Sequence, residues 1–212
     1  MTVTEFKECR LPLIKMSVDQ FLKQSYPNKE LLIINRGGQY DIPLQNNIRI
    51  IDTSGIETLG ESRNIALDNI SDGWVIVWDD DDWRHEEYLS ALIQRVGVDR
   101  TALYKHRHRL NVNFYTGQTY IGQNYTIGLF DINHLKHRYD HINKHEDYHF
   151  TNLFNHILLD IPENYYVRFW HGDNVSAKAR ILENTPTTKY TDQIQSIILS
   201  VKNSNSQQSI WF

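Results

Sequence analysis

The sequence predicts an α/β domain with a mostly parallel central sheet flanked by helices. Short apolar runs alternate with amphipathic segments along the first half of the chain, an order typical of βαβ units. The runs at residues 31–34 and 73–78 are continuously apolar, which favours strands covered on both faces. With 212 residues, 40% of them hydrophobic, the chain can bury one sizeable core.

The spacing of apolar residues predicts the elements in order. Helical spacing indicates helices over residues 11–24, 62–69, 86–96 and 146–159. The last is the clearest, because its apolar stripe comprises Phe150, Leu153, Phe154, Ile157 and Leu158. Strands are expected at residues 31–34, 49–51, 73–78, 101–110, 112–116, 125–130 and 165–170. We expect one domain over residues 1–202, followed by a polar tail over residues 203–212.

Composition and charge narrow the functional classes. The formal net charge of −4 disfavours general binding of DNA or RNA, because such binding depends on positive charges that contact the phosphates. One cysteine, Cys9, excludes an intrachain disulfide and a multi-cysteine zinc site. No stretch approaches the ~20 apolar residues of a transmembrane helix, and residues 1–10 lack the apolar run of a signal peptide. These features predict a soluble cytoplasmic protein, in the host cytoplasm if its origin is viral.

Four consecutive aspartates, Asp79 to Asp82, directly follow the apolar run at residues 73–78. In open α/β sheets, ligands bind outside the carboxyl ends of the strands, where this run would lie. Adjacent carboxylates repel one another, and a hard divalent cation carrying a phosphorylated ligand would compensate their charge. The alternative is a solvated acidic loop that caps the next helix. The preceding strand and the following Trp83 favour the ligand site.

Five segments, in the expected order, resemble the GT-A nucleotide-sugar glycosyltransferases, especially the large family 2. The segments are residues 21–34 with their QSYPNKE turn, 60–64 (GESRN), 73–83 with the aspartate run, 145–147 (HED) and 171–176 (HGDNVS). The resemblance covers about residues 1–180 and implies the Rossmann-like GT-A fold. The chain's size also resembles virus-encoded (chlorovirus-type) members and single N-terminal modules, which implies further domains of a longer polypeptide.

The resemblance implies roles on the donor side. Asp79 and Asp81 match the DxD motif that binds Mn²⁺ or Mg²⁺, and His171 would close the metal shell. Asp80 would meet the ribose, and Arg63 would lie near the donor diphosphate. Oxygen ligands with one imidazole suit these cations better than zinc. A cation and an arginine would together neutralise the charge of the leaving diphosphate.

The resemblance also implies the general base and the nucleotide contact. Asp147 would accept a proton from the acceptor hydroxyl in an inverting transfer, held ionised by the dipole of the helix that it begins. Glu146 is the rival, since adjacent residues on a helix point ~100° apart. After the second strand the family usually carries Asp-Asp, where this chain has Asn35 and Arg36. Asn35 can still pair with a pyrimidine edge, so UDP is the favoured nucleotide.

The sequence thus predicts a metal-dependent inverting glycosyltransferase that moves a sugar from a UDP-sugar to a hydroxyl of a glycan acceptor. A transferase acting on hydroxymethylated DNA bases is an alternative, and so is a non-catalytic module that binds a nucleotide-sugar or glycan. By resemblance, the loops at residues 117–123 and 135–144 would choose the acceptor.

Other polar and aromatic residues have simpler interpretations. The stretch 106–109 (HRHR) is better explained as an exposed strand face than as a nucleic-acid patch. The histidines between residues 134 and 149 are better explained as surface residues than as metal ligands. Trp74, Trp78 and Tyr88 are expected in the core, whereas Trp83 and Trp170 either pack there or stack on a sugar or base.

Overall fold

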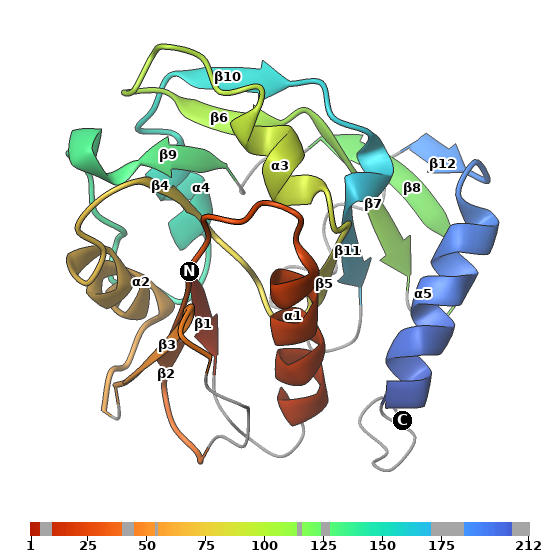
Figure 1. The fold of residues 1–212 in the computed structure, drawn as a ribbon, viewed down its shortest axis with the longest axis horizontal. Helices are drawn as coiled ribbons and strands as arrows, with labels where there is room; N and C mark the ends of the chain where they lie inside the picture. Colours follow the sequence, from red (N-terminus) through yellow and green to blue (C-terminus); the bar gives the residue numbers. More distant parts are fainter. Residues whose placement is uncertain are drawn as a thin grey trace.

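The structure, a computed structural model, describes residues 1–4, 10–39, 45–53, 55–113, 116–123, 128–170 and 185–204. The α/β class is confirmed (Figure 1). The helices are α1 (Leu11–Lys23), α2 (Leu59–Asp68), α3 (Tyr88–Ile93), α4 (Glu146–Thr151) and α5 (Thr191–Ser204), with short 3₁₀ turns η2 (Ile132–His134) and η3 (Glu163–Tyr165). The strands are β1 (Thr2–Thr4), β2 (Leu31–Asn35), β3 (Ile48–Asp52), β4 (Trp74–Ile76), β5 (Asp82–Arg84), β6 (Leu103–His106), β7 (His108–Asn113), β8 (Thr119–Gln123), β9 (Leu129–Asp131), β10 (His156–Leu159), β11 (Tyr166–Trp170) and β12 (Thr185–Thr187).

The N-terminal strands form a parallel sheet in the order β1-β2-β3. Two backbone hydrogen bonds join β1 to the chain around the end of β4: Met1 N donates to Ile76 O at 2.8 Å, and Trp78 N donates to Met1 O at 2.7 Å. This sheet therefore continues into a second one of order β10-β6-β9-β4. The carboxyl ends of β1, β2 and β3 meet at one edge, close to where the aspartate run begins.

The remaining sheets are mixed rather than parallel. In the second, β9 is antiparallel to both β4 and β6, whereas β10 and β6 are parallel. A five-stranded sheet of order β12-β8-β7-β11-β5 contains one parallel pair, β7 with β11. The parallel arrangement that the sequence pattern predicts thus holds for β1, β2 and β3.

Strand β2 explains why the predicted apolar run is continuous. Leu31 and Ile33 belong to the core on the face covered by α1 and α3, whereas Leu32 and Ile34 belong to the core shared with α2 and α4. Because side chains alternate between the two faces of a strand, covering both faces requires every residue to be apolar.

The predicted helix over residues 146–159 is confirmed for residues 146–151 and wrong beyond them. Helix α4 ends at Thr151, and His156–Leu159 forms β10, which pairs with β6 at the edge of the sheet. Leu153 and Leu158, two members of the predicted apolar stripe, are 51% and 45% exposed. Asn155 O accepts a hydrogen bond from Leu103 N at 2.9 Å. Pairing with a strand that is distant in the sequence, rather than the helical spacing of apolar residues, therefore determines the structure of this segment.

Helix α5 was not predicted from the sequence. Ile194, Ile197 and Ile198 pack on the five-stranded sheet, at the side of the molecule opposite α2 (Figure 1). The helix includes the first two residues of the predicted tail, and residues 205–212 lie outside the described part of the chain. Among the residues that the structure describes, no helix combines the length and hydropathy needed to cross a bilayer.

Candidate functional site

Three polar residues stand in a row where β1, β2 and β3 end. The strand register places Thr4 beside Asn35 and Asn35 beside Asp52. The Asn35 amide nitrogen donates to Asp52 Oδ1 at 2.7 Å and to the carbonyl of Gly38 at 3.0 Å. Asn35, the predicted nucleotide contact, is 2% exposed, whereas Asp52 is exposed. The sequence interpretation missed Asp52, although its place directly after a predicted strand was a usable signal.

The aspartate run divides into two pairs. Asp80 and Asp82 are 4% and 2% exposed, whereas Asp79 and Asp81 are only partly buried. Helix α3 begins at Tyr88, beyond the run, and its N-cap makes no side-chain hydrogen bond. The alternative of a solvated loop capping the next helix is therefore wrong. The two accessible carboxylates are those of the predicted metal pair.

Asp80 is held inside the protein. Thr4 Oγ1 donates to Asp80 Oδ2 at 2.5 Å, and the Arg10 guanidinium donates to both carboxylate oxygens, with Nε at 3.3 Å from Oδ2. Burial raises the pKa of Asp80, and the charge of Arg10 opposes that rise. Asp80, predicted to meet the ribose, is thus bound by two residues of this chain. Arg10 lies 70 positions away, so no spacing in the sequence pointed to it.

Asp82 is the other buried carboxyl of the run. The Tyr166 hydroxyl donates to Asp82 Oδ2 at 2.5 Å. Burial, and then the charges of Asp81 and Asp79, raise the pKa of Asp82 to about 7. The folded protein therefore keeps the Asp82 carboxyl protonated at pH values where a free aspartate is already ionised.

We expect this carboxyl to make stability depend on pH. An unfolded aspartate titrates near ~3.9, so between that pH and about 7 the folded protein binds more protons than the unfolded chain. The free energy of unfolding should fall as pH rises through this window, and Asp82→Asn should remove that loss. Urea unfolding in chelator should show the variant more stable than wild type near ~pH 8 and similar near ~pH 4. A difference that does not vary with pH would contradict this expectation.

Arg63, on α2, joins the aspartate run to α4. Its Nη1 lies 3.2 Å from Glu146 Oε1 and also contacts the Asp147 carboxylate, while its Nη2 lies 3.6 Å from Asp79 Oδ1. The Arg63 side chain is only 5% exposed, so the guanidinium is buried. The structure thereby brings the predicted metal ligand Asp79 and the predicted base Asp147 to the same side chain.

Asp147 and Glu146 differ in accessibility. The Asp147 side chain is 19% exposed and that of Glu146 is 6% exposed. Helix α4 has only six residues and follows His145, whose φ of 65° lies in the left-handed region. The guanidinium in direct contact, rather than the dipole of so short a helix, is therefore the main positive charge acting on Asp147.

The carboxylates fit a cation that arrives with a phosphorylated ligand. Among the described residues, no three His, Cys, Asp or Glu side chains form a ready-made metal site. Mg²⁺ bound with a substrate diphosphate typically uses only one or two protein carboxylates, and Asp79 and Asp81 supply two. His171, the third predicted ligand, and the side chain of Trp170 lie outside what the structure describes.

Several other interpretations can now be judged. The exposed strand face predicted at residues 106–109 is wrong for His106 and Arg109, which are 0% and 4% exposed. Burial lowers the pKa of His106 to about 4, and its Nε2 lies 2.9 Å from Ile161 O. The histidines between residues 134 and 149 do lie at or near the surface, as predicted. Trp78 and Tyr88 are in the core, as predicted, and Trp74 is partly buried against it.

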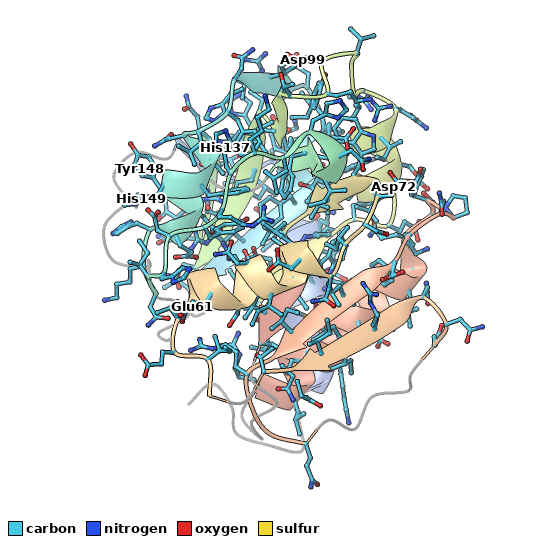
Figure 2. The ribbon with its side chains drawn as sticks, turned by 90° about the vertical axis from the view of Figure 1, so that its left-hand side faces the viewer. Glu61, Asp72, Asp99, His137, Tyr148 and His149 are labelled. Carbon is cyan, nitrogen blue, oxygen red and sulfur yellow. The ribbon has the colours of Figure 1, made fainter. Side chains whose placement is uncertain are left out.

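A cavity of about 580 Å³ opens at the other end of the parallel strands. It is lined by residues at the starts of β2, β3 and β4, including Glu30, Arg49 and Asp72, and by none of the predicted site residues. Figure 2 shows Asp72 at the opposite side of the molecule from Glu61 of α2. The predicted site residues that the structure describes therefore lie outside this cavity.

Comparison with known families gives one clear match. The sequence model of glycosyl transferase family 2 matches residues 6–159. No curated protein matches the chain in sequence.

Solved structures match over nearly the whole chain. The structure of S. aureus TarS 1–349 in complex with UDP-GlcNAc has a TM-score of 0.64 at 15% identity, covering 98% of this chain and 75% of that one. A longer S. aureus TarS structure has a TM-score of 0.59 at 12% identity. The match covers 98% of this chain, which therefore spans less than half, 45%, of that TarS chain. The mannosyltransferase PcManGT from Pyrobaculum calidifontis, in complex with GDP-Man and Mn²⁺, has a TM-score of 0.57 at 10% identity, covering 97% and 73%. These likenesses confirm the GT-A fold.

Proposed function

Since the chain belongs to glycosyl transferase family 2, we propose that it is a metal-dependent inverting glycosyltransferase. It moves a sugar from a nucleoside diphosphate, with UDP favoured, to a hydroxyl of a glycan acceptor. The observation that carries this proposal is the contact of one buried guanidinium, Arg63, with both Asp79 and Asp147. That contact joins a candidate cation-binding carboxylate to a candidate general base.

The charge around Arg63 supports the need for a cation. Three carboxylates, those of Asp79, Glu146 and Asp147, contact this one guanidinium, and the charge of Arg168 also acts on Asp79 and Asp81. A diphosphate brought to these carboxylates would be repelled less if a cation came with it. Asp79 and Asp81 would hold Mn²⁺ or Mg²⁺, and the cation would neutralise charge on the leaving group. PcManGT has been solved with Mn²⁺, which fits this expectation.

In the proposed reaction, the protein itself contributes a general base that accepts one proton. The Asp147 carboxylate accepts the proton of the acceptor hydroxyl while the hydroxyl oxygen bonds to the anomeric carbon. The bond from that carbon to the diphosphate breaks, and the nucleoside diphosphate leaves with the electron pair. One displacement without a covalent intermediate inverts the anomeric configuration. Arg63 holds the Asp147 side chain through their direct contact.

The ends of the parallel strands would hold the nucleoside. Asp52 offers an exposed carboxylate that accepts hydrogen bonds from a ribose or from the imide N–H of uracil. Asn35 fixes Asp52 from the neighbouring strand through its 2.7 Å hydrogen bond. The complex of TarS 1–349 with UDP-GlcNAc is in keeping with a uridine nucleotide, whereas PcManGT was solved with GDP-Man. The resemblance to virus-encoded members stays a prediction.

A ligand panel tests the proposal. We expect UDP and UDP-sugars to raise the melting temperature with Mn²⁺ or Mg²⁺ present and not in chelator, because ligands that bind only the native state stabilise it by about 2.7 kcal/mol at 100 times their Kd. Release of UDP should then accelerate when glycans carrying free hydroxyls are added. Equal stabilisation in chelator would contradict the cation-dependent site. Donor binding without transfer to any glycan would favour a binding module.

A further inference from the structure

The segment 139–143, which immediately precedes α4, lies across the first turns of α2. The first backbone N–H groups of a helix have no partner within the helix. Here Leu59 N donates to Asn143 Oδ1 at 2.9 Å, and Gly60 N donates to Ile142 O at 3.2 Å. Figure 2 shows Glu61 of α2 on the same side of the molecule as Tyr148 and His149 of α4. The segment therefore caps the helix that carries Arg63.

Asn64 makes the tightest link between this segment and α2. Its Nδ2 donates to Tyr139 O at 2.9 Å, and its Oδ1 accepts from Tyr139 N at 2.9 Å. A Cβ at Gly60, one turn earlier, would collide with the carbonyl oxygen of Asp140, so the two backbones are in close contact. One amide side chain and one glycine thus set the distance between α2 and the segment.

Tyr139 connects the segment 139–143 to α4. Its buried ring stacks on Phe150 of α4, with ring centroids 3.9 Å apart and planes 12° apart. The Arg63 guanidinium lies 5.3 Å from the centroid of the same ring. Phe150 follows Asp147 by less than one helical turn, so a shift of Tyr139 moves the helix that carries Asp147.

We infer that Asn64 is a positioning residue for Asp147. Resting on the proposed function, the inference is that the two Asn64–Tyr139 hydrogen bonds hold α4 where the Asp147 carboxylate reaches the acceptor hydroxyl. The segment 139–143 is part of the loop at residues 135–144, predicted to choose the acceptor. In this inference it connects α2, which carries Arg63, to α4, which carries Asp147. A displacement of about 1 Å at a reacting group can cost about 100-fold in rate.

The test compares two asparagines of α2. Asn64→Ala removes both hydrogen bonds to Tyr139, whereas Asn69→Ala removes a bond of 2.9 Å to Ile65 O at the other end of α2. We expect Asn64→Ala to lower kcat for transfer by roughly 10- to 100-fold and to leave the Kd for UDP and Mn²⁺ within about 3-fold. Asn69→Ala should match wild type in both. Equal kcat in the two variants overturns the inference.

A double variant separates positioning from general destabilisation. Because Asn64 acts through Asp147, Asn64→Ala should lower kcat by less than about 2-fold in an Asp147→Asn background. The same loss in both backgrounds overturns the inference. If Asn64→Ala does not fold, Asn64→Asp serves instead, since it keeps the acceptor for Tyr139 N and turns the donor into an oxygen that faces Tyr139 O. The same split between kcat and Kd is expected.

Amide hydrogen exchange reports on the link without activity. In Asn64→Ala, and not in Asn69→Ala, exchange across residues 139–151 should accelerate, because the segment loses its anchor on α2. Unchanged exchange overturns the inference even if wild type transfers sugar. A wild type that transfers no sugar overturns the proposed function, and accelerated exchange in that case still supports the link between α2 and α4.

Discussion

Asp147→Asn is expected to lower the rate of transfer at least ~100-fold while the affinity for donor and cation stays near that of wild type. An amide cannot take the proton of the acceptor hydroxyl, which removes the general base but keeps the shape of the side chain. Arg63 remains next to Asp79 and Glu146, so its buried charge is still paired and the fold should persist. Steady-state kinetics together with calorimetric titration of UDP would measure both quantities.

Glu146→Gln is the matched control, since it makes the same change one residue away. Glu146 is 6% exposed, and its carboxylate faces Arg63 from inside the protein, so the transfer rate should fall much less. The product's anomeric configuration, assigned by NMR, should be opposite to that of the donor. Full activity of Asp147→Asn, or a retained configuration, would show that the base or the mechanism is a different one.

Asp81→Asn should abolish the dependence of nucleotide binding on the divalent cation. Asp81 is one of the two accessible carboxylates of the run, and a neutral amide is a much weaker ligand for a hard cation. We expect the affinity for UDP to be the same in Mn²⁺ and in chelator, and similar to that of wild type in chelator. Isothermal titration with UDP under both conditions measures this directly.

Asp68→Asn is the control for this experiment. Asp68 lies at the end of α2, is 60% exposed, pairs with Arg138 at 3.1 Å and is not one of the predicted site residues. Its variant should keep the full effect of Mn²⁺ on UDP affinity. If Asp81→Asn also keeps that effect, the cation is not held by this pair of carboxylates.

Local patterns were sufficient for the parts of the fold that depend on neighbouring residues. Leu31 to Ile34 are all apolar because both faces of β2 are covered, so burial could be predicted without knowing the partners. Helix α1 follows the predicted spacing almost to the residue. The spacing failed at residues 152–159, because pairing with β6 overrode a helical pattern.

The sequence by itself determined the fold class, the family resemblance and the candidates Asp79, Asp81 and Asp147, because each is carried by a short motif next to a strand or helix. Only the tertiary structure decided which carboxylates of the run are buried, that Glu146 is less accessible than Asp147, and that Arg63 joins the two halves of the site. Burial and charge pairing depend on side chains far apart in the chain, as the 70 positions between Arg10 and Asp80 illustrate. Such contacts exist only once the chain has folded, and no local pattern encodes them.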